Sequence, residues 1–98
     1  MKEIVHQLNK AFESRIRLGI MSILVVNEKV SYKRLKELLD LTDGNLASHL
    51  KALEKLKYIE VEKTFMDRKP HTTYDVTTDG RKAFSNHLSA LEQLLNKN

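Results

Sequence analysis

Two short amphipathic helices joined by a tight turn are predicted between residues 31 and 59, and this feature constrains the fold most strongly. Leucines recur at helical spacing on both sides of a break at residues 40–41, so each segment has one apolar stripe. The stripes contain Leu35, Leu38 and Leu39 in the first segment, and Leu46, Leu50, Leu53 and Leu56 in the second. Helices of this kind pack their stripes on a shared core, and we expect them at 31–40 and 43–57.

Start signals support both helices. Ser31 and Thr42 stand where a hydroxyl oxygen can accept a hydrogen bond from the free N–H groups of a first turn. Asp43 follows at a position where the helix dipole favours negative charge. These signals place the helix starts at Ser31 and Thr42.

The second helix presents an outer face without acids. A projection of about 100° per residue places small, polar and basic residues opposite the leucines: Gly44, Asn45, Ser48, Lys51, Ala52 and Lys55. Such a face fits the major groove of DNA, which admits one helix. Asn45 and Ser48 are suited to base edges, and Lys51 and Lys55 to phosphates. An ordinary solvated helix face has the same composition and is the alternative.

The first helix of the pair begins with two cations, Lys33 and Arg34. The helix dipole disfavours positive charge there by about a few tenths of a kcal/mol. A nearby anion would explain them, because free N–H groups and adjoining cations form a phosphate site. We expect residues from both helix starts to contact DNA: Ser31, Tyr32, Lys33 and Arg34 in the first, with Thr42 and Gly44 in the second. The alternative is that the cations only keep the surface soluble.

A β-hairpin is predicted at residues 58–77. Apolar and polar residues alternate in YIEVEKTF (58–65) and in HTTYDVT (71–77), as in half-buried strands. MDRKP between them contains the turn formers Asp67 and Pro70. Val30 is expected to add a short third strand.

Two cations, Arg68 and Lys69, lie at the predicted tip, residues 66–71. A hairpin that follows a helix pair is a wing, and these side chains could reach a neighbouring minor groove or its phosphates. The alternative is a tip that charge keeps hydrated.

A central core helix is predicted at residues 14–26, where SRIRLGIMSILVV is apolar on most faces. Gly19 in its middle costs about 1 kcal/mol relative to Ala. That cost is tolerable where another helix crosses closely.

Terminal helices are predicted at 1–13 and 79–96, the second capped by Thr78. Two adjacent apolar stripes run along the C-terminal helix, more than a helix at the edge of a small domain can bury alone. We expect both helices to meet their symmetry mates in a homodimer; a helical hairpin between the termini of one chain is the alternative. The expected interface contains Ile4, Leu8 and Phe12 with His87, Leu88, Leu91, Leu94 and Leu95.

Composition excludes several classes of function. The chain of 98 residues has no cysteine, so disulfides and thiolate metal sites are excluded. It has no apolar run of membrane length, and we expect a cytoplasmic protein. The net charge of +4 is a mild bias, so the placement of the cations carries more weight than their number. No catalytic constellation or cofactor motif is found, which excludes an enzyme.

Two histidines have assignable positions. His49 lies on the flank of the second helix, where it can donate to a phosphate or pack against the neighbouring helix, and we favour the phosphate. His87 lies in an apolar stripe without the several ligands at one-turn spacing that a metal needs, so we expect a structural role and no metal site.

The order of these elements resembles that of the winged helix-turn-helix transcriptional regulators of the MarR and ArsR type, in particular a compact branch of about this length. The matching segments are SRIRLGIM (14–21), LTDGNL (41–46), SHLK (48–51), RKP (68–70), TTY (72–74) and TTDGR (77–81). The resemblance covers about residues 14–95. It implies an α+β, mainly α fold with a two- to three-stranded wing and terminal helices for dimerisation. It also implies a prokaryotic, dimeric, sequence-specific DNA-binding regulator, usually a repressor.

The sequence departs from this pattern in two ways. Lys57 stands where relatives commonly have glycine, and a left-handed lysine there would cost about 1 kcal/mol, unless the helix ends differently. The chain is also too short for the long terminal helices that enclose an effector cleft in larger relatives. A small-molecule effector is therefore not indicated.

We expect a single domain, 1–98, that binds double-stranded DNA as a homodimer and reads a palindromic operator. Helix 43–57 would lie in the major groove, with the wing tip beside it. The alternative from another class is a winged-helix module whose polar face binds an acidic protein, and RNA binding is a third reading.

Overall fold

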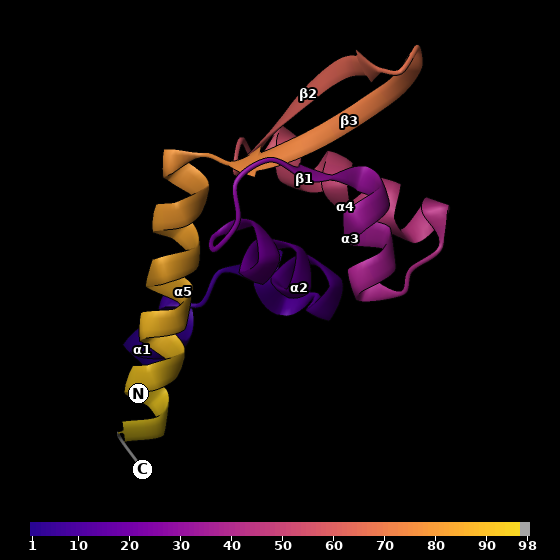
Figure 1. Cartoon of the computed structure of the whole chain (residues 1–98). Coiled ribbons are helices and arrows are strands. Elements are labelled where there is room, and N and C mark those ends of the chain that lie inside the picture. Colours follow the sequence, from indigo (N-terminus) through magenta and orange to yellow (C-terminus); the bar gives the residue numbers. More distant parts are fainter. Residues whose placement is uncertain (97–98) are drawn as a thin grey trace.

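The computed structural model describes residues 1–96 and shows a helical body from which a β-hairpin and one long helix extend (Figure 1). In chain order the elements are α1 (Lys2–Gln7), the 3-10 helix η1 (Lys10–Glu13), α2 (Arg15–Leu24), β1 (Val30–Ser31), α3 (Tyr32–Leu39), α4 (Asp43–Lys55), β2 (Ile59–Met66), β3 (Lys69–Val76) and α5 (Thr78–Asn96). The predicted α+β, mainly helical winged-helix fold is confirmed. None of the helices within residues 1–96 has the length and apolar character that crossing a bilayer requires.

The core lies where α2, α3 and α4 meet. Its fully buried side chains are Ile20, Met21, Leu24, Leu35, Leu46, Leu50 and Leu53. Gly19 allows α3 to approach α2 closely, because a Cβ there would lie 2.9 Å from Cδ2 of Leu39. The close helix crossing predicted at Gly19 is therefore present.

The core helix α2 ends two residues earlier than expected. Polar side chains donate hydrogen bonds to carbonyls that would accept backbone N–H groups in a longer helix. Nδ2 of Asn27 donates to the carbonyl of Ile23, and the Arg81 guanidinium donates to that of Val25 at 2.8 Å. These bonds satisfy the last turn and tie it to the start of α5.

The sheet has the order β1-β3-β2 and is antiparallel throughout. Val30 pairs with Tyr74, which confirms the predicted third strand. The hairpin turn is tighter than expected, because Met66 pairs with Lys69 and only Asp67 and Arg68 lie between the strands. Both turn residues have positive φ, 52° and 65°. Two left-handed residues in succession match the twist of the flanking strands.

The end of α4 adopts a left-handed conformation at Lys57, with φ of 64°. The N–H of Lys57 donates to the carbonyl of Glu54, and the N–H of Tyr58 to that of Leu53, which is the Schellman pattern. The Thr77 hydroxyl donates to the Lys57 carbonyl at 2.7 Å. Contacts on both sides thus hold a lysine where glycine would be unstrained.

The single N-terminal helix expected at 1–13 is wrong. The chain breaks at Asn9, whose side-chain oxygen accepts from the N–H of Ala11 and whose own N–H donates to Nδ1 of His87. An asparagine that satisfies the backbone in this way competes with a continuous helix. The break turns Phe12 into the core, away from the stripe it was expected to share with Ile4.

Thr77, and not Thr78, caps α5, because the Thr77 hydroxyl oxygen accepts from the N–H of Gly80 at 2.9 Å. The first turn of α5 lies directly on the end of α4. A Cβ at Gly80 would come within 2.0 Å of the Tyr58 carbonyl oxygen. This contact fixes how α5 leaves the helical body in Figure 1.

Candidate nucleic-acid interface

The outer face of α4 is available to a ligand. Leu46, Leu50 and Leu53 are buried beneath it. The predicted contact residues on the opposite side are all exposed: Gly44, Asn45, Ser48, Lys51 and Lys55. At Gly44 an added Cβ would meet nothing within 4 Å, so the start of the helix is open. The sequence projection placed these five residues correctly, but Ala52 on the same predicted face is half-buried, and Leu56, expected in the core stripe, is 46% exposed.

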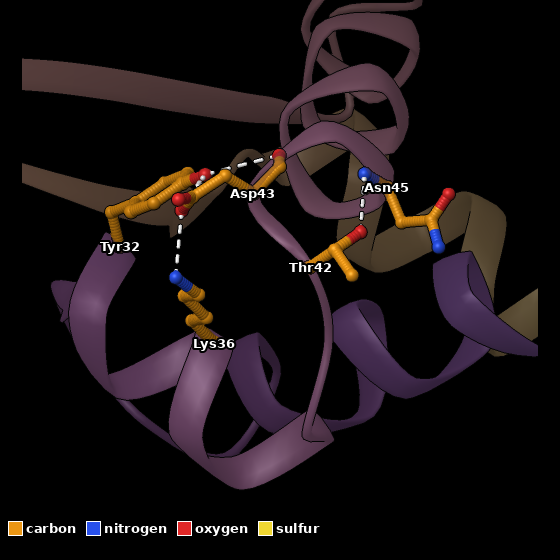
Figure 2. A network of polar contacts seen from close by, with 5 residues as sticks. All are labelled: Tyr32, Lys36, Thr42, Asp43 and Asn45. Carbon is orange, nitrogen blue, oxygen red and sulfur yellow. Dashed lines mark hydrogen bonds and ion pairs between the residues drawn. The ribbon is translucent and has the colours of Figure 1, made fainter.

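A polar network joins α3 to the start of α4 (Figure 2). The Tyr32 hydroxyl lies 3.1 Å from Oδ1 of Asp43, and Nζ of Lys36 lies 3.0 Å from the same oxygen. The Thr42 hydroxyl oxygen accepts from the N–H of Asn45, as expected of an N-cap. Figure 2 shows the Asn45 amide pointing away from the network. The network therefore orients the helix start without using the side chain expected to read a base.

The network also shifts two pKa values. The ion-paired hydrogen bond from Lys36, followed by the bond from Tyr32, lowers the pKa of Asp43. Burial, followed by the hydrogen bond to the Asp43 carboxylate, raises the pKa of Tyr32. Both groups stay in the state that keeps the network intact at neutral pH.

The phosphate grip expected at the start of α3 is only partly available. Tyr32 was predicted to join it, but its hydroxyl is directed to Asp43, which gives the tyrosine a structural role. The Ser31 hydroxyl oxygen accepts from the N–H of Arg34, so it serves as the cap. Lys33 and Arg34 are exposed and remain the two cations there that can approach an anion, although the Arg34 guanidinium also lies 3.9 Å from Oε2 of Glu37.

His49 is packed against α2, which was the less favoured of its two readings. Nε of Arg17 donates to Nδ1 of His49 at 3.0 Å. Burial, followed by the Arg17 charge, lowers the pKa of His49. The half-buried imidazole therefore stabilises the contact between α2 and α4 through Nδ1, which leaves the N–H of the neutral ring on Nε2. The predicted phosphate contact stays a prediction.

The tip of the wing extends beyond the helices, as Figure 1 shows. Arg68 occupies the turn and Lys69 begins β3, and both are exposed. Nearer the body, the hairpin is tied down by an ion pair of 3.6 Å between Lys29 and Glu62. The two predicted wing cations are thus held at the end of a long, regular ribbon.

Two relevant basic residues escaped the sequence reading. Lys36 belongs to the network of Figure 2. Arg15 is exposed at the start of α2 and lines the same surface hollow as Asn45, together with Leu41. A cation in the last turn of one helix before an acid in the first turn of the next could have indicated the Lys36 pair, whereas nothing local indicated Arg15.

The terminal helices pack on each other within one chain, as in the alternative to dimerisation. Three residues of the expected interface are buried inside the chain, namely Ile4, Phe12 and His87. Placing them in an interface was wrong. Leu8 and Leu94 are half-buried. The rest of the expected interface is exposed on α5: Leu88, Leu91 and Leu95.

His87 has the structural role that was expected. It is 5% exposed, accepts the N–H of Asn9 at 2.9 Å and packs edge-on against Phe12. Burial lowers its pKa, although the nearby Glu13 charge acts in the opposite direction. Within residues 1–96, no three His, Asp or Glu side chains are grouped so as to hold a metal ion.

Fold and exposed helix face together define a winged-helix protein of the DNA-binding class. A family model described as winged helix DNA-binding domain matches residues 16–95, and the chain belongs to this family. It is 39% identical over 85 residues to an uncharacterised protein of Methanocaldococcus jannaschii, which covers 87% of this chain and 92% of that protein.

Solved structures support the same assignment. The transcriptional regulator homologue of Pyrococcus horikoshii OT3 superimposes with a TM-score of 0.89 at 31% identity, over 99% of this chain and 97% of that one. MepR of Staphylococcus aureus in complex with DNA shares the fold at a TM-score of 0.71 and 15% identity, over 98% of this chain and 76% of that one. MarR shares the fold at a TM-score of 0.71 and 20% identity, over 94% of this chain and 64% of that one. The predicted winged-helix resemblance is confirmed by the family model and by the fold that this chain shares with MarR and MepR.

Proposed function

We propose that this protein is a sequence-specific transcriptional regulator that binds double-stranded DNA as a homodimer and represses by occupying a palindromic operator. The observation that carries the proposal is the outer face of α4, where Asn45, Ser48, Lys51 and Lys55 are exposed together on the side opposite the buried Leu46, Leu50 and Leu53. A single helix with such a face fits the major groove.

Each exposed residue has a role in this complex. Asn45 and Ser48 lie in the first two turns of α4, the part of a recognition helix that contacts base edges. Lys51 and Lys55 lie farther along the same face and neutralise phosphates. Gly44 lets the helix start approach the duplex, because the space around it is open.

The surrounding cations extend the contact. Arg15, Lys33 and Arg34 hold phosphates beside the major groove, and Arg68 and Lys69 reach the adjacent minor groove. These contacts give affinity and register, whereas α4 gives sequence preference. The MepR relative was solved in complex with DNA, which supports a DNA role for the shared fold.

The homodimer forms through α5. Leu88 and Leu91 are 45% and 38% exposed, and they line an open apolar hollow between α5 and α2 with Leu18 and Phe84. An apolar stripe of this length next to a hollow is typical of an association surface. Two-fold symmetry then places two copies of α4 one helical turn apart on the duplex, which is why the operator is palindromic.

The repressor role is proposed because the sequence offers a DNA-binding surface and no second activity. We found no catalytic constellation in the sequence, so occupancy of the operator is the effect we propose. A cytoplasmic location agrees with access to DNA in a prokaryote, and no small-molecule effector is part of the proposal.

Selection from a randomised duplex library tests the proposal. The full chain is mixed with the library, bound duplexes are separated by gel shift, and the bound fraction is sequenced. We expect a palindromic motif with half-sites about 10 base pairs apart, and an affinity that falls steeply as salt rises. Enrichment of no sequence, with only weak binding at low salt, would contradict it and favour a module that contacts a protein.

A further inference from the structure

Large apolar side chains are exposed at the far end of the hairpin. Phe65 is 77% exposed and Met66 is 59% exposed. In the ladder, Phe65 lies opposite Pro70 and Met66 lies opposite Lys69. Antiparallel partners point to the same face of a sheet, so Phe65 and Pro70 form one apolar pair. Met66 lies on the other face.

The apolar pair continues the face that the helices bury at the base of the hairpin. Ile59 and Tyr74 are buried there, and every second residue along β2 shares that face. Phe65 lies four residues beyond Val61, about 13 Å along the strand. In Figure 1 this part of the hairpin is clear of the helices. On this face a polar pair, Lys63 opposite Thr72, separates the buried base from the exposed apolar pair at the far end.

Charge along the hairpin is divided in the same way. The base is acidic and the far end is basic: Glu60, Glu62 and Asp75 lie near the body, whereas Lys63, Arg68 and Lys69 lie toward the tip. Asp67 is the one acid in residues 63–71, and it occupies a left-handed turn position with φ of 52°, which aspartate tolerates well. An exposed aromatic ring surrounded by cations matches a polyanion with apolar faces, and stacked bases are such a partner.

We propose that Phe65, supported by Pro70, is an apolar wedge that enters the DNA minor groove next to the α4 site and unstacks one base step. Apolar side chains inserted from the minor groove unstack and kink a duplex, and the cations beside Phe65 hold the flanking phosphates. This inference rests on the proposed function, because it needs a bound duplex. It adds a sequence preference for flexible pyrimidine–purine steps where no hydrogen bond reads a base.

The test uses the duplex recovered by the selection described above, with 2-aminopurine substituted in turn at each position of the flank that faces the wing. Binding of the full wild-type chain should raise the fluorescence of the probe at one step, because the probe brightens when it is unstacked. Phe65→Ala should abolish that rise and weaken binding about fivefold or more, the loss expected of one stacked aromatic. Phe65→Leu should keep part of the signal.

Met66→Ala is the matched control, because it removes the neighbouring exposed apolar side chain, which lies on the opposite face of the same ribbon. It should leave the fluorescence rise in place. The slope of affinity against salt should be the same for Phe65→Ala and the wild type, since no phosphate contact is removed.

The possible failures are distinct. If the wild type enriches a sequence but Phe65→Ala binds and unstacks it equally well, the wedge is refuted and the regulator stands. If Phe65→Ala changes the sedimenting mass, Phe65 is a protein contact and the wedge is refuted. If the wild type binds no duplex specifically, the proposed function fails and the wedge fails with it.

Discussion

An ion pair between Lys36 and Asp43 joins α3 to α4 across the turn of the helix-turn-helix, with Nζ of Lys36 3.0 Å from Oδ1 of Asp43. Lys36 lies in the last turn of α3 and Asp43 in the first turn of α4. Each charge is favoured by the dipole of its own helix end. The Tyr32 hydroxyl shares the same carboxylate, so one exposed acid fixes how α4 leaves the turn.

Replacing Asp43 should lower the Tm at neutral pH but not at acid pH. Its pKa is lowered in the folded chain, first by Lys36 and then by Tyr32. The contribution of the pair is therefore present above the ordinary carboxyl pKa of about 4 and is lost as the pH falls through the lower folded value. We expect Asp43→Asn to have a lower Tm than the wild type at pH 7, and the difference should shrink below about pH 4.

Thermal unfolding followed by circular dichroism at several pH values measures this difference. Lys36→Met should give the same pattern, and the double variant should lose little more than either single one. A Tm difference that stays constant down to acid pH would show that the ion pair is not its source.

The reading helix was predictable because its causes are local. The leucine stripe of α4 and the Thr42 cap lie within one segment, so periodicity and start signals place its outer face. The departures from expectation have distant causes. Asn9 breaks the N-terminal helix through a bond to His87, which lies 78 residues away in sequence. His49 turns inward because Arg17, on another helix, donates to it. No pattern within one segment contains either partner.

Gly80 should be intolerant of any side chain, whereas Gly44 should accept one. A Cβ at Gly80 would come within 2.0 Å of the Tyr58 carbonyl oxygen, a backbone atom that cannot turn aside. We expect Gly80→Ala to lower the free energy of unfolding by about 2 to 3 kcal/mol, as overpacking does. Urea denaturation measures the change.

Gly44→Ala is the control, because nothing lies within 4 Å of the added Cβ and its φ is not positive. It should be neutral or raise the free energy of unfolding by up to about 1 kcal/mol. An equal loss in the free energy of unfolding for both variants would show that the room for a Cβ does not decide the effect.

His87 should make the fold less stable as the solution becomes mildly acidic. Burial lowers its pKa in the folded chain, partly offset by Glu13. Protonation therefore favours the unfolded chain, so the contribution of neutral His87 is complete above its unfolded pKa of about 6.5 and is lost as the pH falls toward the folded value. The wild-type Tm should fall between pH 7.5 and pH 5, which calorimetry measures.

His87→Gln should have a lower Tm at pH 7.5 and a weaker dependence on pH. Part of the dependence should remain, because burial also lowers the pKa of His49. The exposed His6→Gln variant is the control and should follow the wild type. An undiminished pH dependence in His87→Gln would assign the effect elsewhere.

Asn45 and Lys55 should affect DNA binding in different ways. Asn45→Ala should relax the preference at one base pair by about 1 to 3 kcal/mol, because it removes a base contact. Lys55→Ala should weaken binding to all sequences alike and reduce the salt slope by about 1, because it removes a phosphate contact. Competition gel shifts with single-base operator variants, repeated at several salt concentrations, separate the two. Exchange of the two signatures would mean that α4 lies in the groove in another orientation.

Leu91 should be necessary for association of two chains. It is 38% exposed and lies between Leu88 and Leu95 on the outer stripe of α5, so an aspartate there would not disturb the buried side of the helix. In a dimer the same charge would be buried without a partner twice, once in each copy, which is far more costly than leaving it in water. We expect Leu91→Asp to sediment at half the mass of the wild type and to bind an operator half-site weakly while keeping its circular dichroism spectrum. Leu38→Asp, at a 48% exposed leucine on α3, is the matched control and should keep the wild-type mass. An unchanged mass for Leu91→Asp would remove the α5 stripe as the dimer interface and leave the reading helix to act from a single copy.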